Sequence, residues 1–225
     1  MAVKKALVLN QQTGLGSPVQ TGEVIGGAEV AGSLTTAGAG TLTAALLINS
    51  LLNRTGPTAG FTDTTDTAAN IIAALAGQNF VGTGSPGGAG GVQPGTTWRL
   101  RYVNGVAYAM TLAAGTGVTI ATGNVTASYI KDYLLTVTNG TPQQIFVANV
   151  DGSTAVITGM TQSQTNLLSV GMLVTGTGIA ASSNIISIQP GVGVTLNNNT
   201  TVANTSAIVT FNPTVTMTGI GQFVA

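Results

Sequence analysis

Short stretches in which apolar and polar residues alternate predict that much of the chain forms half-buried β-strands. The clearest is WRLRYV at 98–103, where the arginines would share one face of a strand and the aromatic rings the other. Asn104-Gly105 and an apolar-rich segment at 106–112 follow, so we expect a β-hairpin with a two-residue type I′ turn. Further strands are expected at 117–121, 132–138 and 144–149. The pattern predicts a mainly β fold, an antiparallel β-sandwich or small barrel.

One segment has the apolar spacing of a helix. Ala68, Ile71, Ile72 and Leu75 fall at i, i+3, i+4 and i+7, and a glycine follows. We therefore predict one short amphipathic helix at 67–76, packed on the sheet.

Two neighbouring features bear on this helix. Asp63 and Asp66 precede it, and we expect them to cap its first turn rather than to act as paired catalytic carboxylates or cation ligands. The apolar segment at 41–54 is either a buried strand or a short helix, because its periodicity does not decide between them.

The distribution of glycine divides the chain into three parts. Residues 1–34 are glycine-rich and favour an extended N-terminal arm. Residues 35–151 would form the β-sandwich or barrel domain, with a flexible glycine-rich loop at 82–95. Residues 152–225 would form a second small β domain, with strands at 155–158, 171–175, 184–189, 192–196 and 207–211. If the alternating residues 214–218 return to the first sheet, this second unit is an insertion.

Charge is the unusual feature of the composition. Only 5% of the residues are charged, the six basic and six acidic residues cancel, and no charged residue follows Asp151. Soluble proteins typically carry about 25%. So little charge favours association with other protein surfaces, because no net repulsion keeps copies apart.

Charge and hydropathy also exclude some partners. Six basic residues spread along the chain do not make a nucleic-acid groove. No apolar run reaches the roughly 20 residues that span a bilayer, and the N-terminal apolar run is too short for a signal peptide. We expect synthesis in the cytoplasm, with neither nucleic acid nor membrane as a partner.

The chain contains no cysteine and no histidine. It therefore lacks thiol nucleophiles, Cys/His zinc ligands and the commonest general base. Gly82–Gly87 and Gly176–Ala181 resemble fragments of a dinucleotide fingerprint, but the first runs into more glycines and the second has no later carboxylate for a ribose. We predict no catalytic, cofactor-binding or metal-binding residues, and hence a protein that is not an enzyme.

Two charged groups have alternative interpretations. Arg99 and Arg101, with Trp98 and Tyr102, could form a cationic and aromatic surface for glycan or nucleic acid. The alternation is more typical of a strand with one buried and one exposed face, whose arginines could contact a neighbouring subunit. Lys131-Asp132 would lie at the start of a strand and form a solvated pair.

Several segments resemble a recurrent module of tailed-bacteriophage virion proteins: RTGPTAGFTDTTDTAANIIAA at 54–74, WRLRYVNGVAYAMTLAAGTGVTI at 98–120 and YLLTVTNGTP at 133–142. Segments at 167–179, 184–188 and 194–202 resemble a small β repeat that is also common in phage structural proteins. Such modules occur in head decoration (capsid cement) proteins and in head or tail fibres. The resembling segments lie between residues 54 and 202, and the resemblance implies a homo-oligomer, usually a trimer or higher, in the virion.

Two functions are therefore expected. The first is a capsid decoration protein on the phage head, which stabilises the shell through contacts with itself and with the major capsid protein, its arm at 1–34 lying along a neighbour. The alternative is a fibre, spike or tail protein that binds a host receptor or glycan through Trp98, Tyr102 or the second β unit. A hydrolase is disfavoured by the absence of histidine and the shortage of carboxylates.

Overall fold

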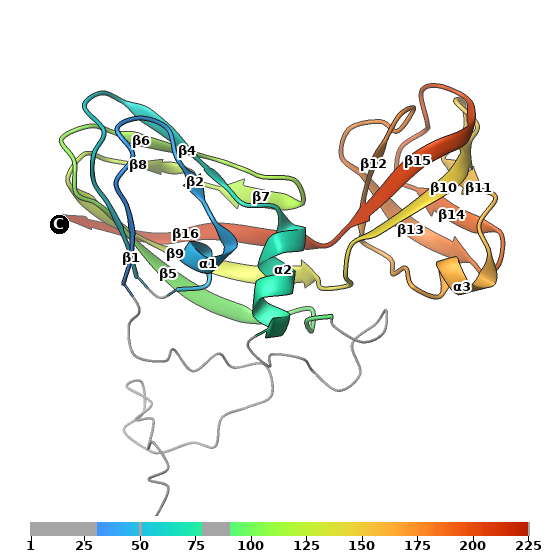
Figure 1. Ribbon diagram of the computed structural model, residues 1–225, viewed down its shortest axis with the longest axis horizontal. Helices are drawn as coiled ribbons and strands as arrows, with labels where there is room; N and C mark the ends of the chain where they lie inside the picture. Colours follow the sequence, from blue (N-terminus) through green and yellow to red (C-terminus); the bar gives the residue numbers. More distant parts are fainter. Residues whose placement is uncertain (1–30, 50, 78–90, 225) are drawn as a thin grey trace, which may run out of the picture.

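The chain folds into two β-rich units, a sandwich and a barrel (Figure 1). The computed structural model describes residues 31–49, 51–77 and 91–224. The predicted class, mainly β with a short helix, is confirmed. Most of the expected arm and the motif Gly82–Gly87 lie outside the described residues.

The sandwich contains β1 (Ala31–Leu34), β2 (Thr41–Leu42), α1 (Ala44–Leu47), β3 (Leu51–Arg54), β4 (Phe61–Thr65), α2 (Ala68–Gly77), β5 (Thr97–Asn104), β6 (Met110–Ala113), β7 (Val118–Ala121), β8 (Asn124–Val125), β9 (Tyr129–Asn139) and β16 (Thr214–Val224). The barrel contains β10 (Gln144–Val150), β11 (Val156–Thr158), α3 (Gln162–Thr165), β12 (Leu173–Gly176), β13 (Ser183–Gln189), β14 (Gly193–Leu196) and β15 (Asn204–Asn212).

In the sandwich the chain alternates between two sheets. The larger sheet has the order β1-β3-β5-β9-β16-β7, and the smaller has the order β2-β4-β6-β8. Because a strand of the other sheet separates successive members, β1, β3 and β5 run parallel, and so do β2, β4 and β6. The β5–β9 and β9–β16 pairs are antiparallel. The expected antiparallel pairing thus describes only part of this unit.

The hairpin expected at Asn104-Gly105 is wrong. β5 and β6 lie in different sheets, and β5 pairs with β3 and β9 instead. The buried Asn104 amide donates hydrogen bonds to the carbonyls of Tyr108 (2.8 Å) and Thr126 (3.0 Å), which holds a wider connection in place of a two-residue turn.

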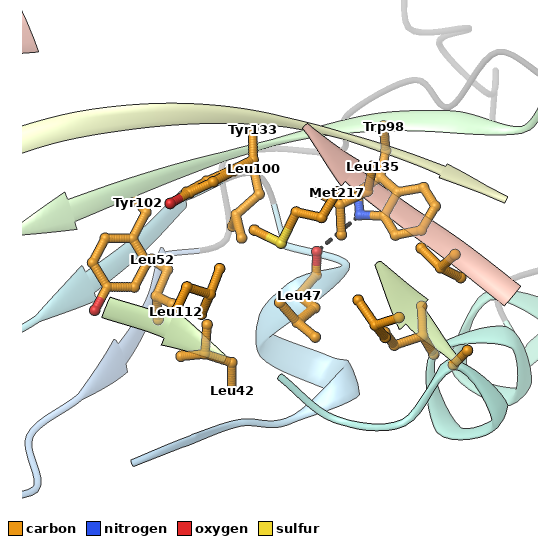
Figure 2. Close-up of a cluster of buried hydrophobic side chains, with 14 of the residues drawn as sticks. Leu42, Leu47, Leu52, Trp98, Leu100, Tyr102, Leu112, Tyr133, Leu135 and Met217 are labelled. Carbon is orange, nitrogen blue, oxygen red and sulfur yellow. Dashed lines mark hydrogen bonds between the residues drawn. The ribbon is translucent and has the colours of Figure 1, made fainter. Parts of the chain in front are cut away.

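The apolar faces of both sheets enclose one core, which α1 and α2 complete (Figure 2). On β5 the buried side chains are Trp98, Leu100 and Tyr102, as the alternation predicts. The Trp98 Nε1 donates to the Leu47 carbonyl at 2.8 Å, which fixes α1 against the sheet. The segment at 41–54 therefore contains both a short helix and strands, since β2, α1 and β3 follow one another within it.

The predicted helix is α2, which starts one residue later than expected. Its buried side chains are the four that the periodicity indicates: Ala68, Ile71, Ile72 and Leu75. Thr67 is the residue that caps its first turn, because its Oγ1 accepts from the Asn70 backbone N–H at 3.2 Å. Helix and sheet thus share the core of the sandwich.

The second unit is a closed barrel with the strand order β10-β11-β14-β13-β12-β15. Its first strand begins at Gln144, not at 152, because β10 pairs with β15 and β11. Its last strand ends before β16, which pairs with β9 and β7 in the larger sheet of the sandwich. The barrel is therefore inserted between two adjacent strands of the first unit, the arrangement in which 214–218 return to that sheet.

Two adjacent connections join the barrel to the sandwich. Asn139 and Thr214 are partners in register, so the chain leaves and re-enters the sandwich at one place. The Asn139 amide donates to Ser169 Oγ and to the Val170 carbonyl, both at 2.9 Å, and so ties β9 to a barrel loop. The two units are thus linked by side-chain contacts as well as by the chain.

Two further expectations need correction. The loop expected at 82–95 contains a core residue, because Val92 is fully buried and its N–H donates to the Gly140 carbonyl at 3.0 Å. A Cβ at Gly140 would lie 1.8 Å from the Val92 carbonyl oxygen, so only glycine fits there. Residues 31–34, assigned to the arm, form the edge strand β1.

Candidate functional site

The most deeply buried charges form a structural cluster. The side chains of Arg54 and Asp63 are fully buried, and Arg54 Nε lies 2.8 Å from Asp63 Oδ2. The Tyr102 hydroxyl donates to the same oxygen at 2.9 Å. Burial and the adjacent carboxylate raise the pKa of Tyr102, so the phenol stays protonated and serves as a donor. The cluster joins β3, β4 and β5 in the core and presents no group to solvent.

The two aspartates before α2 have separate roles. Asp63 lies in β4 and does not cap the helix, so that expectation is wrong for this residue. Asp66 does not accept from a backbone N–H of the first turn either: its carboxylate accepts from the N–H of the capping residue Thr67 and from the Asn70 Nδ2, at 2.8 and 2.6 Å, and also from the Ala44 N–H. It therefore holds the start of α2 against α1 without capping the helix. In the described part of the chain, no three acidic side chains gather where they could hold a metal ion.

Among the described residues, the exposed basic side chains lie on the outer face of the larger sheet. The side chains of Arg99 and Arg101 are 57% and 46% exposed, and both pair with the buried carboxylate of Asp132. Burial opposes the ionisation of Asp132, but hydrogen bonds from the two guanidinium groups hold its pKa below the ordinary value. Two positive charges and one negative charge leave this face with a small positive excess.

Lys131 and Asp132 do not form the expected solvated pair. They lie within β9, on opposite faces, and both are buried. Lys131 Nζ donates to the carbonyls of Thr122 and Asn124, each at 2.7 Å, and lies 5.3 Å from the centre of the Tyr133 ring. Desolvation lowers its pKa. Lys131 therefore fastens the turn between β7 and β8 to the sheet.

The aromatic side chains proposed as an adhesive surface are not available for one. Trp98 is 6% exposed and Tyr102 is fully buried, so neither can stack on a glycan. The strand interpretation of WRLRYV is the one that the structure supports, and only its arginines reach solvent. The alternation in WRLRYV is enough to predict which of its side chains are buried, because strict alternation with aromatic residues on one face is typical of a half-buried strand.

The barrel has an unusual surface. Among the described residues, nine of the exposed large apolar side chains lie on the barrel and five on the sandwich. The nine are Ile145, Val147, Val156, Leu167, Val170, Ile186, Val192, Val202 and Ile208. The barrel's only charged residue is Asp151, which is exposed. Its surface therefore combines exposed apolar side chains with uncharged polar ones and is nearly uncharged.

An open groove of about 560 Å³ lies beside this surface. Asn149, Asp151, Thr154, Thr158 and Thr205 supply its polar groups. Amide, carboxylate and hydroxyl groups can bind the hydroxyl groups of a ligand. None of the residues that line the groove is aromatic, so it offers no platform for stacking on a sugar ring.

The second glycine-rich fragment is a turn. Gly176 ends β12, Gly178 has a φ of 80°, and the segment continues into β13 without a helix. It therefore lacks the helix N-terminus that a dinucleotide phosphate requires.

The comparisons with known proteins do not assign the chain to a family. No family model, curated protein or solved structure matched it. None of the helices in the described ranges is long and apolar enough to cross a membrane.

Proposed function

We propose that the chain is a non-enzymatic structural protein of a phage virion, a capsid decoration protein that stabilises the head through subunit contacts. The observation that carries the proposal is the barrel surface, on which nine large apolar side chains are exposed and one residue is charged. Exposed large apolar side chains in such number favour sites of protein contact, because leaving them in water is unfavourable. The resemblance of the sequence to tailed-bacteriophage virion proteins supports a role in the virion.

The division of the molecule supports the same proposal. The sandwich has its own core, and several of its few charged side chains are buried within it. Arg54 pairs with Asp63, and Lys131 donates to backbone carbonyls. Its remaining exposed basic groups, Arg99 and Arg101, lie on one face. A sandwich with exposed arginines on one face, joined to a nearly uncharged barrel with exposed apolar side chains, suits a protein that binds a shell and its own neighbours.

A fibre or spike protein that binds a host receptor is the second candidate. The groove at Asn149, Asp151 and Thr154 favours it, because its polar groups are open to solvent at the distal end of the barrel strand β10. In this case the ligand would be held by hydrogen bonds to these groups and by apolar contact with Val156 and Ala203, without aromatic stacking.

Copy number separates the two candidates. Particles of a phage that encodes the chain would be purified, and the ratio of this protein to the major capsid protein measured by quantitative mass spectrometry. Hundreds of copies per particle, with density on the outer shell in cryo-electron microscopy, are expected for decoration. A few dozen or fewer, located at a fibre or the tail, would support the second candidate. Absence from the particle would refute both.

A further inference from the structure

Three exposed apolar side chains form a continuous stripe on two neighbouring strands of the barrel. Ile145 and Val147 lie on β10 and are 60% and 58% exposed, and Ile208 on β15 is 65% exposed. Val147 and Ile208 are direct cross-strand partners, and Ile145 is the next outward residue on β10. We call these three residues the apolar stripe.

The sequence of both strands is that of strands covered on two sides. IFVA at 145–148 and AIVTF at 207–211 are nearly continuous apolar runs, which are typical of strands buried on both faces. The barrel interior covers only one face of each strand. Phe146 and Phe211 are in contact on this inner face, and Val209 is fully buried there. In the single chain the other face has no cover.

The charge of the surroundings indicates what kind of surface covers the stripe. The flanking outward residues are Thr175, Thr210, Ser206 and Asn149, and none is charged. An uncharged apolar partner is therefore the electrostatic match, and the same stripe on another copy meets that requirement without repulsion. The barrel is closed and offers no free strand edge, so the contact must be made face to face.

We propose that the apolar stripe binds the apolar stripe of a second copy in a twofold contact. The proposal rests on the proposed structural function, whose homo-oligomer it provides with a contact surface. Three side chains and their polar neighbours cover less than the roughly 800 Å² per partner of a standard interface. The pairwise contact is accordingly weak and depends on concentration, and it becomes effective where many copies are held side by side on one particle.

The test uses charge variants of the full-length chain. Val147 is more than half exposed, so Val147→Asp and Val147→Lys leave the barrel core intact, which circular dichroism and thermal melting would verify. In a twofold contact each variant places like charges near one another. Sedimentation equilibrium should show at least about a hundredfold weaker self-association for each variant alone. An equimolar mixture of the two should associate again, because Asp then faces Lys.

The matched control is Ile186→Asp, on β13. Ile186 is 54% exposed, and β12 separates its strand from β15 in the barrel order. This variant should associate as the unmodified chain does. If the unmodified chain is monomeric up to millimolar concentration, or if Val147→Asp associates normally, the proposal is overturned. Loss of association that mixing does not restore would overturn the twofold geometry.

The same variants distinguish this inference from the function on which it rests. If the protein is present on particles and Val147→Asp still associates normally, the stripe is not the contact and the structural role stands. If mixing restores association but the protein is absent from particles, the stripe is a self-contact and the proposed function fails.

Discussion

At the scale of single residues, the described charges act mainly inside the molecule. Arg54 donates to the carbonyls of Leu34, Thr36 and Gly38 as well as to Asp63, so one guanidinium fixes the connection between β1 and β2. Burying a charge is unfavourable unless it is paired and hydrogen-bonded. This cluster meets both conditions, which explains how a chain with few charges places two of them in its core.

Replacement of Asp63 tests the cluster. Asp63→Asn removes the negative charge and leaves the Arg54 guanidinium buried without a counterion. The free energy of unfolding should fall by about 3–5 kcal/mol, as measured by urea denaturation. Asp151→Asn is the control, because this exposed side chain should change stability by about 0.5 kcal/mol or less. A loss at Asp63 as small as that of the control would show that the pair is not important for stability.

The pKa of Asp132 makes a prediction about acid stability. Its folded-state pKa lies below the ordinary value of 3.8, so the pairing with Arg99 and Arg101 stabilises the fold above that value. As the pH falls through the folded pKa the carboxyl group gains a proton, and this stabilisation is lost. Unfolding midpoints in urea should drop as the pH falls below about 5, and by less in Asp132→Asn. An equal drop in both proteins would contradict the assignment.

At the scale of elements, Trp98 links a helix to the sheet. Trp98→Ala would remove a large buried side chain and should lower the free energy of unfolding by about 3–5 kcal/mol. Trp98→Phe keeps much of the apolar contact but leaves the Leu47 carbonyl without its donor, and should cost about 1–3 kcal/mol. Guanidinium denaturation followed by circular dichroism measures both. If Trp98→Phe is as stable as the unmodified chain, the hydrogen bond does not contribute.

Alternation along the chain predicted most strands, but not their partners. The local pattern gave β5, β9, β10 and α2 with nearly correct bounds. It could not show that the chain crosses between two sheets, because a crossing depends on contacts between residues far apart in sequence. Asn104-Gly105 has the composition of a tight turn, yet the burial of Asn104 determines the connection. Tertiary contacts thus overrode turn propensity.

The candidate surface was harder to predict than the strands. The runs at 145–148 and 207–211 were interpreted as strands, but an apolar run alone does not say which face is outward. The apolar stripe follows only from the register of β10 with β15 and from the closure of the barrel. The low charge of the segment is visible in the sequence, and most of the exposed large apolar side chains of the described residues lie in the same segment.

At the scale of the whole molecule, the sandwich and the barrel have separate cores. The barrel core contains Phe211, Met172, Val174 and Leu196, and every member of it lies between β9 and β16. The sandwich core includes Val215 and Met217, which follow the barrel in sequence. The sandwich is therefore incomplete until the whole barrel has been synthesised.

This arrangement predicts opposite results for two deletions. A chain that ends at Asp151 loses β16, the strand between β9 and β7 in the larger sheet, and should aggregate. A chain in which two residues replace residues 141–213 keeps Gly140 and β16, and the resulting three-residue loop joins Asn139 to Thr214, which are already partners across one antiparallel pair. This second chain should remain folded.

The single tryptophan makes the comparison direct, because Trp98 lies in the sandwich core and its fluorescence reports the folding of that unit alone. The internal deletion should keep the blue-shifted emission of a buried indole and a cooperative urea transition, whereas the truncated chain should lose both. Removing the barrel also removes the apolar stripe, so the shortened protein should sediment as a species that does not associate through that contact. If the internal deletion unfolds and the truncation at Asp151 does not, then β16 is not needed for the sandwich and the barrel is not an independent insertion.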